Sequence, residues 1–172
     1  EIDTGDILLQ ETIEIGTDED CGSVHDRLME TGKHLVTKTV DLIIDCHNNN
    51  QILPKRKQVS DNILKPAPKL FKDNCAIDFN KPAIDIKNMI RGLSPYPAAW
   101  IAKEPVIKGT LAAIASHLVG AKIYKAEVSA IAEQKGHIIV SCADGYIDLL
   151  EIQLPGKKRM AASALLNGLT NA

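Results

Sequence analysis

The sequence predicts an α+β protein in which a strand and a helix precede a small barrel of short strands. Three observations lead to this prediction. Apolar residues alternate over 7–15, recur at helical spacing over 23–46, and form short runs between turn signals after about residue 98. The 172 residues are enough for one or two domains, and a hydrophobic content of 45% is enough for a buried core.

The first predicted elements are a strand over 7–15 and a helix over 23–46. In the strand, Ile7, Leu9 and Ile13 share one face while polar residues interrupt the other, as in a half-buried or edge strand. Ser23 is typical of a helix N-cap, and an acidic residue follows three positions later. The run NNNQ then ends the helical pattern.

A basic linker follows, because residues 52–76 contain three prolines and little periodicity. Between Pro54 and Lys72 only Asp61 opposes the positive charges. The basic residues of the linker are Lys55, Arg56, Lys57, Lys65, Lys69 and Lys72. In a chain of formal charge −2, this concentration of cations favours a strip that contacts phosphates over a solvated connector.

The pattern of residues in the last part of the chain predicts short strands between two helices. Asn80 is a suitable N-cap, and Pro82 suits a first helical turn. Strands are predicted near 98–102, 121–128, 137–142 and 146–153. Asp144–Gly145 is a two-residue hairpin signal, and a final helix from about Met160 ends before Gly168. Residues 109–120 fit a helix, a strand or a packed loop. Short strands with a capping helix indicate a small barrel.

A second basic cluster lies in the run PGKKRM. Lys157, Lys158 and Arg159 fall just before or within the first turn of the last helix. Cations there oppose the helix dipole, so local stability does not require them. The alternatives are a solvated turn and a second contact to a nucleic-acid backbone.

Composition and spacing argue against several other classes of site. Aromatic residues make up only 3%, which argues against a protein that stacks single-stranded bases. Cys21 and His25 lie four apart, but no further zinc ligands follow at suitable spacing. There is no glycine-rich phosphate loop and no apolar run long enough to span a membrane. The four scattered cysteines indicate reduced thiols, as in the cytoplasm.

Several stretches, in order, resemble the methionyl-tRNA formyltransferase family. IDTGDILLQETIEI and GSVHDRLMETGKHLV resemble the end of its catalytic domain, and APKLFKDNCAIDF resembles its linker. IRGLSPYPAAW and ADGYIDLLEIQLPGKKRM resemble segments of its C-terminal domain. The resemblance covers nearly all of the chain, and the last motif is the most specific because it belongs to the tRNA-reading domain.

The resemblance implies a domain division and a fold. Residues 1–51 would be a strand–helix remnant of a Rossmann-like α/β formyltransferase domain, and 52–76 the basic linker. Residues 77–172 would be an OB-like open β-barrel with flanking helices, which binds tRNA. An exposed strand near 7–15 invites pairing with another copy, although the resemblance implies a monomeric full-length enzyme.

The resemblance also implies a reaction, in which a formyl group passes from 10-formyltetrahydrofolate to the amino group of initiator methionyl-tRNA. No metal is involved. The family uses an Asn, a His and an Asp, and the Asp corresponds to Asp3, which would hold the His in its working protonation state. The Asn and His belong to a motif like N-x-H-x-S-L-L-P that these residues lack, so the chain alone is expected to be inactive.

Among the basic residues, the family's linker lysines correspond to Lys69 and Lys72, and its G-K-K to Lys157 and Lys158. Such contacts position the RNA without reading its sequence. Two alternatives remain open. A sibling formyltransferase for a sugar nucleotide, or a folate hydrolase, would not need the lysine-rich segments. A stand-alone nucleic-acid-binding barrel would leave residues 7–46 without a purpose.

Overall fold

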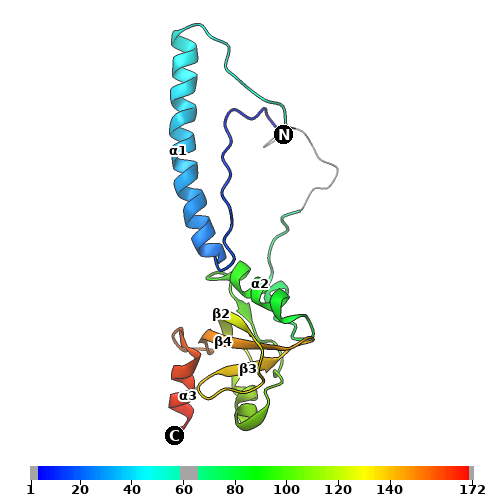
Figure 1. The fold of residues 1–172 in the computed structure, drawn as a ribbon. Coiled ribbons are helices and arrows are strands. Elements are labelled where there is room, and N and C mark those ends of the chain that lie inside the picture. The colour runs from blue at the N-terminus through cyan, green and yellow to red at the C-terminus, as the bar shows by residue number, and fades with distance from the viewer. Residues whose placement is uncertain (1–3, 59–65, 171–172) are drawn as a thin grey trace. The chain divides into compact units, whose positions relative to one another are not determined.

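A computed structural model describes residues 4–58 and 66–170 (Figure 1). The chain divides into two compact units, whose bounds include some residues outside the described ranges. Unit 1 comprises Glu1–Thr17 and Ser23–Lys69. Unit 2 comprises Asp18–Gly22 and Leu70–Ala172. The segment Asp18–Gly22 therefore belongs with the C-terminal part of the chain, although it precedes most of unit 1 in the sequence.

Unit 1 contains most of one long helix, α1 (Cys21–Asn48), which confirms the helix predicted over 23–46. The strand predicted over 7–15 is wrong. Only Ile7 forms a β-bridge, with Arg56, through N–O distances of 2.8 and 2.9 Å. A strand needs a neighbouring backbone to accept and donate its hydrogen bonds. Among the described residues, a single residue of the linker supplies that partner.

The surface of α1 is unusually apolar for a helix in contact with solvent. Its exposed apolar side chains are Leu28, Met29, Val36, Val40, Ile43 and Ile44. The recurrence every three or four residues that predicted the helix therefore includes both exposed residues and the half-buried Val24 and Leu35. None of the helices in the described part of the chain has the length and apolar character needed to cross a membrane.

Unit 2 is built on an open, antiparallel five-stranded sheet with the order β1-β2-β4-β3, and β5 also pairs with β4 (Figure 1). Its strands are β1 (Ala99–Trp100), β2 (Lys122–Ser129), β3 (Ile138–Ser141), β4 (Tyr146–Gln153) and β5 (Met160–Ala161). The first four confirm the predicted strands. Side chains alternate along β4 between the core and the other face of the sheet. Ile147 and Leu149 are buried, while their neighbours are partly exposed.

Helices pack on this sheet. They are η1 (Lys72–Cys75), α2 (Ala83–Leu93), η2 (Gly109–Leu118) and α3 (Ala162–Thr170), where η1 and η2 are 3-10 helices. In α2, Ala83, Ile86 and Ile90 are buried at helical spacing and join the core formed by β2 and β4. The ambiguous region 109–120 is mostly η2, whose Ala115 and Leu118 are also buried.

Two predicted helix ends differ from the structure. Asn80 does not cap α2, because the helix begins at Ala83 and Asn80 instead donates to the Asp78 carboxylate. The Ala83 amide donates to the carboxylate of Asp144 at 2.8 Å, so a hairpin residue distant in sequence satisfies the helix N-terminus. The final helix does not end before Gly168, because α3 continues to Thr170.

Candidate nucleic-acid interface

The lysines of the PGKKRM run lie on a tight turn between β4 and β5. The Lys157 amide donates to the Leu154 carbonyl at 3.0 Å, and Gly156 has a φ of 72°. Proline at the second position and a positive φ at the third are the signature of a type II turn, which Pro155 and Gly156 satisfy. The side chains of Lys157 and Lys158 are exposed, and neither forms an ion pair within the described residues.

A short chain of hydrogen bonds holds this turn on the sheet. The Gln153 side-chain amide donates to the Lys157 carbonyl at 2.8 Å, and the Tyr124 hydroxyl donates to the Gln153 side-chain oxygen at 2.6 Å. Tyr124 is the extra residue in a register shift of β2 between Ile123 and Lys125. Such a bulge redirects a side chain. The sheet therefore orients the backbone that carries Lys157.

Arg159 is placed differently from the two lysines before it. Its Nε and an Nη contact the two carboxylate oxygens of Glu151 at 2.6 and 2.7 Å, and its guanidinium lies 4.2 Å from the centre of the Tyr124 ring. The hydrogen bond from Arg159 lowers the pKa of Glu151. This bidentate pair neutralises much of the charge of Arg159, which the sequence analysis had considered for phosphate binding.

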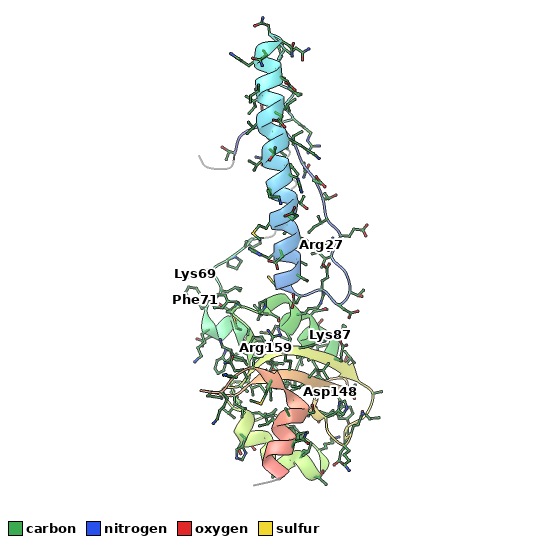
Figure 2. All side chains as sticks on the ribbon, turned by 90° about the vertical axis from the view of Figure 1, so that its left-hand side faces the viewer. Arg27, Lys69, Phe71, Lys87, Asp148 and Arg159 are labelled. Carbon is green, nitrogen blue, oxygen red and sulfur yellow. The ribbon has the colours of Figure 1, made fainter. Side chains whose placement is uncertain are left out.

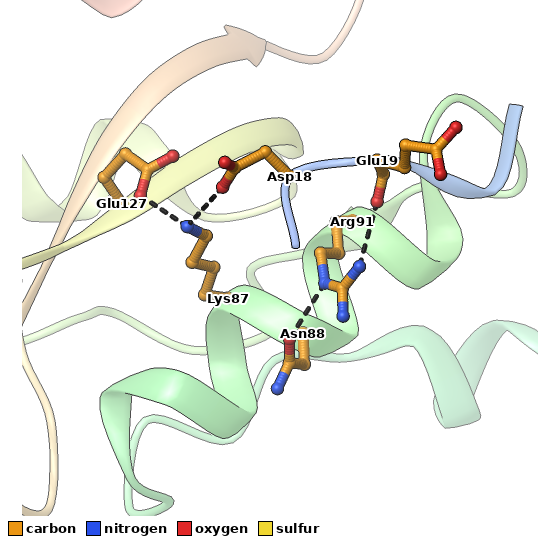
Figure 3. A network of polar contacts seen from close by, with 6 residues as sticks. All are labelled: Asp18, Glu19, Lys87, Asn88, Arg91 and Glu127. Atoms are coloured by element: carbon orange, nitrogen blue, oxygen red, sulfur yellow. Dashed lines mark hydrogen bonds and ion pairs between the residues drawn. The ribbon is translucent and has the colours of Figure 1, made fainter. Parts of the chain in front are cut away.

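A second group of cations in unit 2 is also paired internally (Figure 3). Lys87 on α2 contacts Glu127 at 2.6 Å and Asp18 at 3.1 Å, and its side chain is only 17% exposed. Hydrogen bonding to Glu127, and then to Asp18, raises the pKa of Lys87. Arg91 donates to the Glu19 carbonyl at 3.0 Å and to Asn88 at 2.8 Å. These contacts fasten the segment Asp18–Gly22 to α2.

The predicted linker cations do not share one environment. Lys55 pairs with Asp6 at 3.1 Å, and the Arg56 side chain donates to Gln10, so both have partners within unit 1. Lys57 and Lys69 are exposed (Lys69 is labelled in Figure 2). Lys65 and the predicted catalytic Asp3 lie outside the described residues.

Lys72 begins η1, and it connects the linker to the sheet of unit 2. Its Nζ lies 4.7 Å from the centre of the Trp100 ring, and its carbonyl accepts a hydrogen bond from the Trp100 indole at 2.8 Å. Lys72 therefore has a defined position beside β1. It forms no ion pair among the described residues.

Lys122 is a further exposed lysine near Lys72, and the sequence analysis did not single it out. It is exposed at the start of β2, lines the same hollow as Lys72, and is the cross-strand partner of Gln153, which holds the Lys157 carbonyl. A single lysine before an apolar alternation carries no local signal, and only the pairing of β2 with β4 places it here. We call Lys72, Lys122, Lys157 and Lys158 the basic strip of unit 2.

The described residues offer little for metal or nucleophilic chemistry. Within 4–58 and 66–170, no three His, Cys, Asp or Glu side chains lie close enough to hold a metal ion. Burial and the nearby Asp144 carboxylate raise the pKa of the Cys142 thiol to about 11. That thiol is therefore protonated at neutral pH and is a poor nucleophile.

Comparison with known proteins identifies the family of the chain. The model of the formyl transferase C-terminal domain matches residues 69–170, which contain the whole basic strip. The chain belongs to this formyl transferase family. The match includes β1 to β5 and the PGKKRM turn, and it begins at the predicted linker lysine Lys69.

Relatives of the chain extend the likeness to unit 1. A methionyl-tRNA formyltransferase from Parabacteroides distasonis is 41% identical over 98% of this chain, and one from Flavobacterium johnsoniae is 40% identical over the same share. The chain spans about half of these relatives, 52% of each. A crystal structure of a HypX variant from Aquifex aeolicus covers the whole chain and 30% of its own, with a TM-score of 0.60 and 11% identity, and so shows a shared fold alone.

Proposed function

We propose that this chain belongs to an enzyme that transfers a formyl group from 10-formyltetrahydrofolate to the amino group of initiator methionyl-tRNA, and that unit 2 holds the tRNA. Relatives that are about 40% identical support the reaction, since they bear the name methionyl-tRNA formyltransferase. We further propose that unit 2 is an OB-like domain and that the enzyme is a cytoplasmic monomer acting in translation initiation.

The observation that carries the tRNA-binding role is the contrast among the cations of unit 2. Arg159, Lys87 and Arg91 have acceptors within the unit. The four lysines of the basic strip form no ion pair among the described residues, and three elements of the fold bring them together. Lysines held apart from carboxylates are suited to contacting consecutive phosphates of an RNA backbone.

Unit 1 fits the proposal as the end of the catalytic domain. The apolar side chains exposed along α1 are the kind of surface that the rest of a larger α/β domain, such as a Rossmann-like one, covers. The relatives contain further sequence that this chain does not span. Asp3 keeps its proposed role as the acid that orients a catalytic His.

Salt-dependent binding tests the tRNA-holding role. The chain should bind initiator tRNA, with an affinity that falls steeply as salt rises. Changing all four lysines of the basic strip to Glu should abolish binding. Changing only Lys157 and Lys158 should weaken it and lower the salt slope by about 1.5, since each phosphate contact contributes roughly 0.7–0.9.

The matched control is a double reversal of Lys103 and Lys135, which are also exposed in unit 2 but lie outside the basic strip. It changes the net charge of the chain by the same amount as the Lys157 and Lys158 reversal. Equal losses in the two double variants would mean that only the overall charge matters. Unchanged binding in the fourfold variant would refute the proposed interface.

The role of Asp3 is tested in the full-length enzyme. Asp3→Asn should lower kcat strongly and leave tRNA affinity unchanged, because the carboxylate acts on a catalytic His. Asp6→Asn is a matched control, since Asp6 is a neighbouring carboxylate that pairs with Lys55. A loss of tRNA affinity with Asp3→Asn, or equal kcat in the two variants, would contradict the assignment.

A further inference from the structure

Aromatic side chains are scarce in this chain, yet they gather in one place. The sequence contains six Phe, Tyr and Trp residues, and three of them, Phe71, Tyr96 and Trp100, line one hollow of about 400 Å³ in unit 2. Tyr96 is 83% exposed and Phe71 is 62% exposed. Exposure of large aromatic side chains to water is unfavourable unless a ligand or partner covers them. This clustering therefore indicates a binding site.

Two contacts join Trp100 and Lys72, which both line the hollow. The Trp100 indole donates to the Lys72 carbonyl at 2.8 Å, and the Lys72 ammonium lies 4.7 Å from the ring centre. That cation occupies one face of the indole. A planar ligand that enters the hollow can therefore stack on the exposed ring of Tyr96. Figure 2 marks Phe71 on unit 2.

The charges around the hollow have one sign. Lys72 and Lys122 line it, and no Asp or Glu from the described part of the chain does. The hollow also adjoins the turn of the basic strip, because a Cβ placed on its lining residue Gly120 would lie 3.1 Å from Pro155. Aromatic faces next to lysines are the combination that binds single-stranded nucleic acid, with bases on the rings and phosphates on the ammonium groups.

We propose that this hollow binds an unpaired nucleotide of the tRNA, with its base stacked on Tyr96 and its phosphate near Lys72 and Lys122. The proposal rests on the proposed function and deepens it, because it adds base stacking to an interface otherwise made of phosphate contacts. Stacking accepts any base, so the hollow selects for unpaired RNA rather than for a sequence. A nucleotide within a continuous duplex cannot present its base face to a ring.

Trp100 reports directly on occupancy, because it is the single tryptophan of the chain. We expect a single-stranded RNA tetranucleotide to quench its fluorescence in a saturable way. Inorganic phosphate should not, which separates a nucleotide site from a simple anion site. A blunt-ended RNA duplex should quench more weakly than the tetranucleotide. Equal quenching by duplex and single strand, or none by either, would overturn the proposal.

Substitution of the ring is the second test. Tyr96→Ala should weaken binding of initiator tRNA to the whole chain by about 5- to 150-fold, the range expected for loss of one stacked base. Tyr96→Phe should retain the affinity because it keeps the ring. Since Tyr96 is so exposed, thermal unfolding should hardly change in its Ala variant.

Tyr146 supplies the matched control, because it too carries a lysine, Lys108, 5.2 Å from its ring centre but lies outside the hollow. Tyr146→Ala should leave tRNA affinity unchanged. If the lysine reversals abolish binding while Tyr96→Ala does not affect it, the hollow is not a nucleotide site and the tRNA-holding role still stands. If neither set affects binding, both proposals fail.

Discussion

Two groups of cations in unit 2 have opposite surroundings. Lys87, Arg91 and Arg159 contact carboxylates, a carbonyl or an amide of the same unit, and they join distant segments. The lysines of the basic strip are oriented by the fold but have no acidic partner within the described residues. The comparison teaches that basic character alone does not identify an interface, because a cation with a bonded carboxylate has little charge left for a phosphate.

Removing one cation from each group should produce the largest effect, because the two variants should differ in opposite ways in stability and in tRNA affinity. Lys87→Met removes hydrogen bonds to two carboxylates and should lower the free energy of unfolding by about 2 kcal/mol, which shifts Tm by about 8–16 °C for a domain of this size. Its tRNA affinity should stay the same. Lys122→Met should do the reverse, with weaker tRNA binding and an unchanged Tm in thermal unfolding followed by circular dichroism. Equal Tm losses in both variants would contradict the division into cations that stabilise the fold and cations that bind tRNA.

The turn that presents the basic strip should tolerate only certain residues at Gly156. Because φ is 72° there, Gly156→Ala places a Cβ in the left-handed region and should cost about 1 kcal/mol of unfolding free energy. It should also weaken tRNA binding, since relief of the strain moves Lys157. Gly156→Asn is the control, because Asn adopts this conformation more readily. Denaturant unfolding and tRNA titration of both variants measure the two effects.

Gln153 should affect the interface more than the stability. Gln153→Ala removes the hydrogen bond to the Lys157 carbonyl, so unfolding free energy should fall by only about 0.5–1 kcal/mol. The affinity for tRNA should fall several-fold, because the turn loses its orientation. Tyr124→Phe removes only the hydroxyl that holds Gln153 and should show a weaker form of the same effect. A loss of stability with full tRNA affinity would place Gln153 among the purely structural residues.

The smallest effect should appear in the pH dependence of stability. The pKa of Glu151 is lowered in the folded state by its hydrogen bond from Arg159. The unfolded state therefore binds a proton more readily, and the stabilisation is present above the ordinary Glu pKa of about 4.3 and lost as pH falls through the lowered value. Glu151→Gln should flatten this acid limb in pH-dependent unfolding, whereas Glu104→Gln, at an exposed glutamate elsewhere in unit 2, should not.

Much of the local structure was predictable because it depends on neighbouring residues. The periods of apolar residues predicted α1 and the strands β1 to β4, and the pair Pro155–Gly156 marks a turn by its own backbone preferences. The strand over 7–15 was wrong because alternation shows only that a segment suits a sheet. Pairing requires a second segment, and the described residues supply a single bridge to Arg56.

By itself, then, the sequence determined which segments are helical or extended, and where lysines concentrate along the chain. Only the tertiary structure decided which cations remain available, because that depends on residues far apart in sequence. Pairing of β2 with β4 brought Lys122 beside the PGKKRM turn, and folding placed Glu151 against Arg159. It also gathered Phe71, Tyr96 and Trp100 into one hollow. Charges and rings act over a few ångströms in space, whereas a sequence pattern reports distance only along the chain.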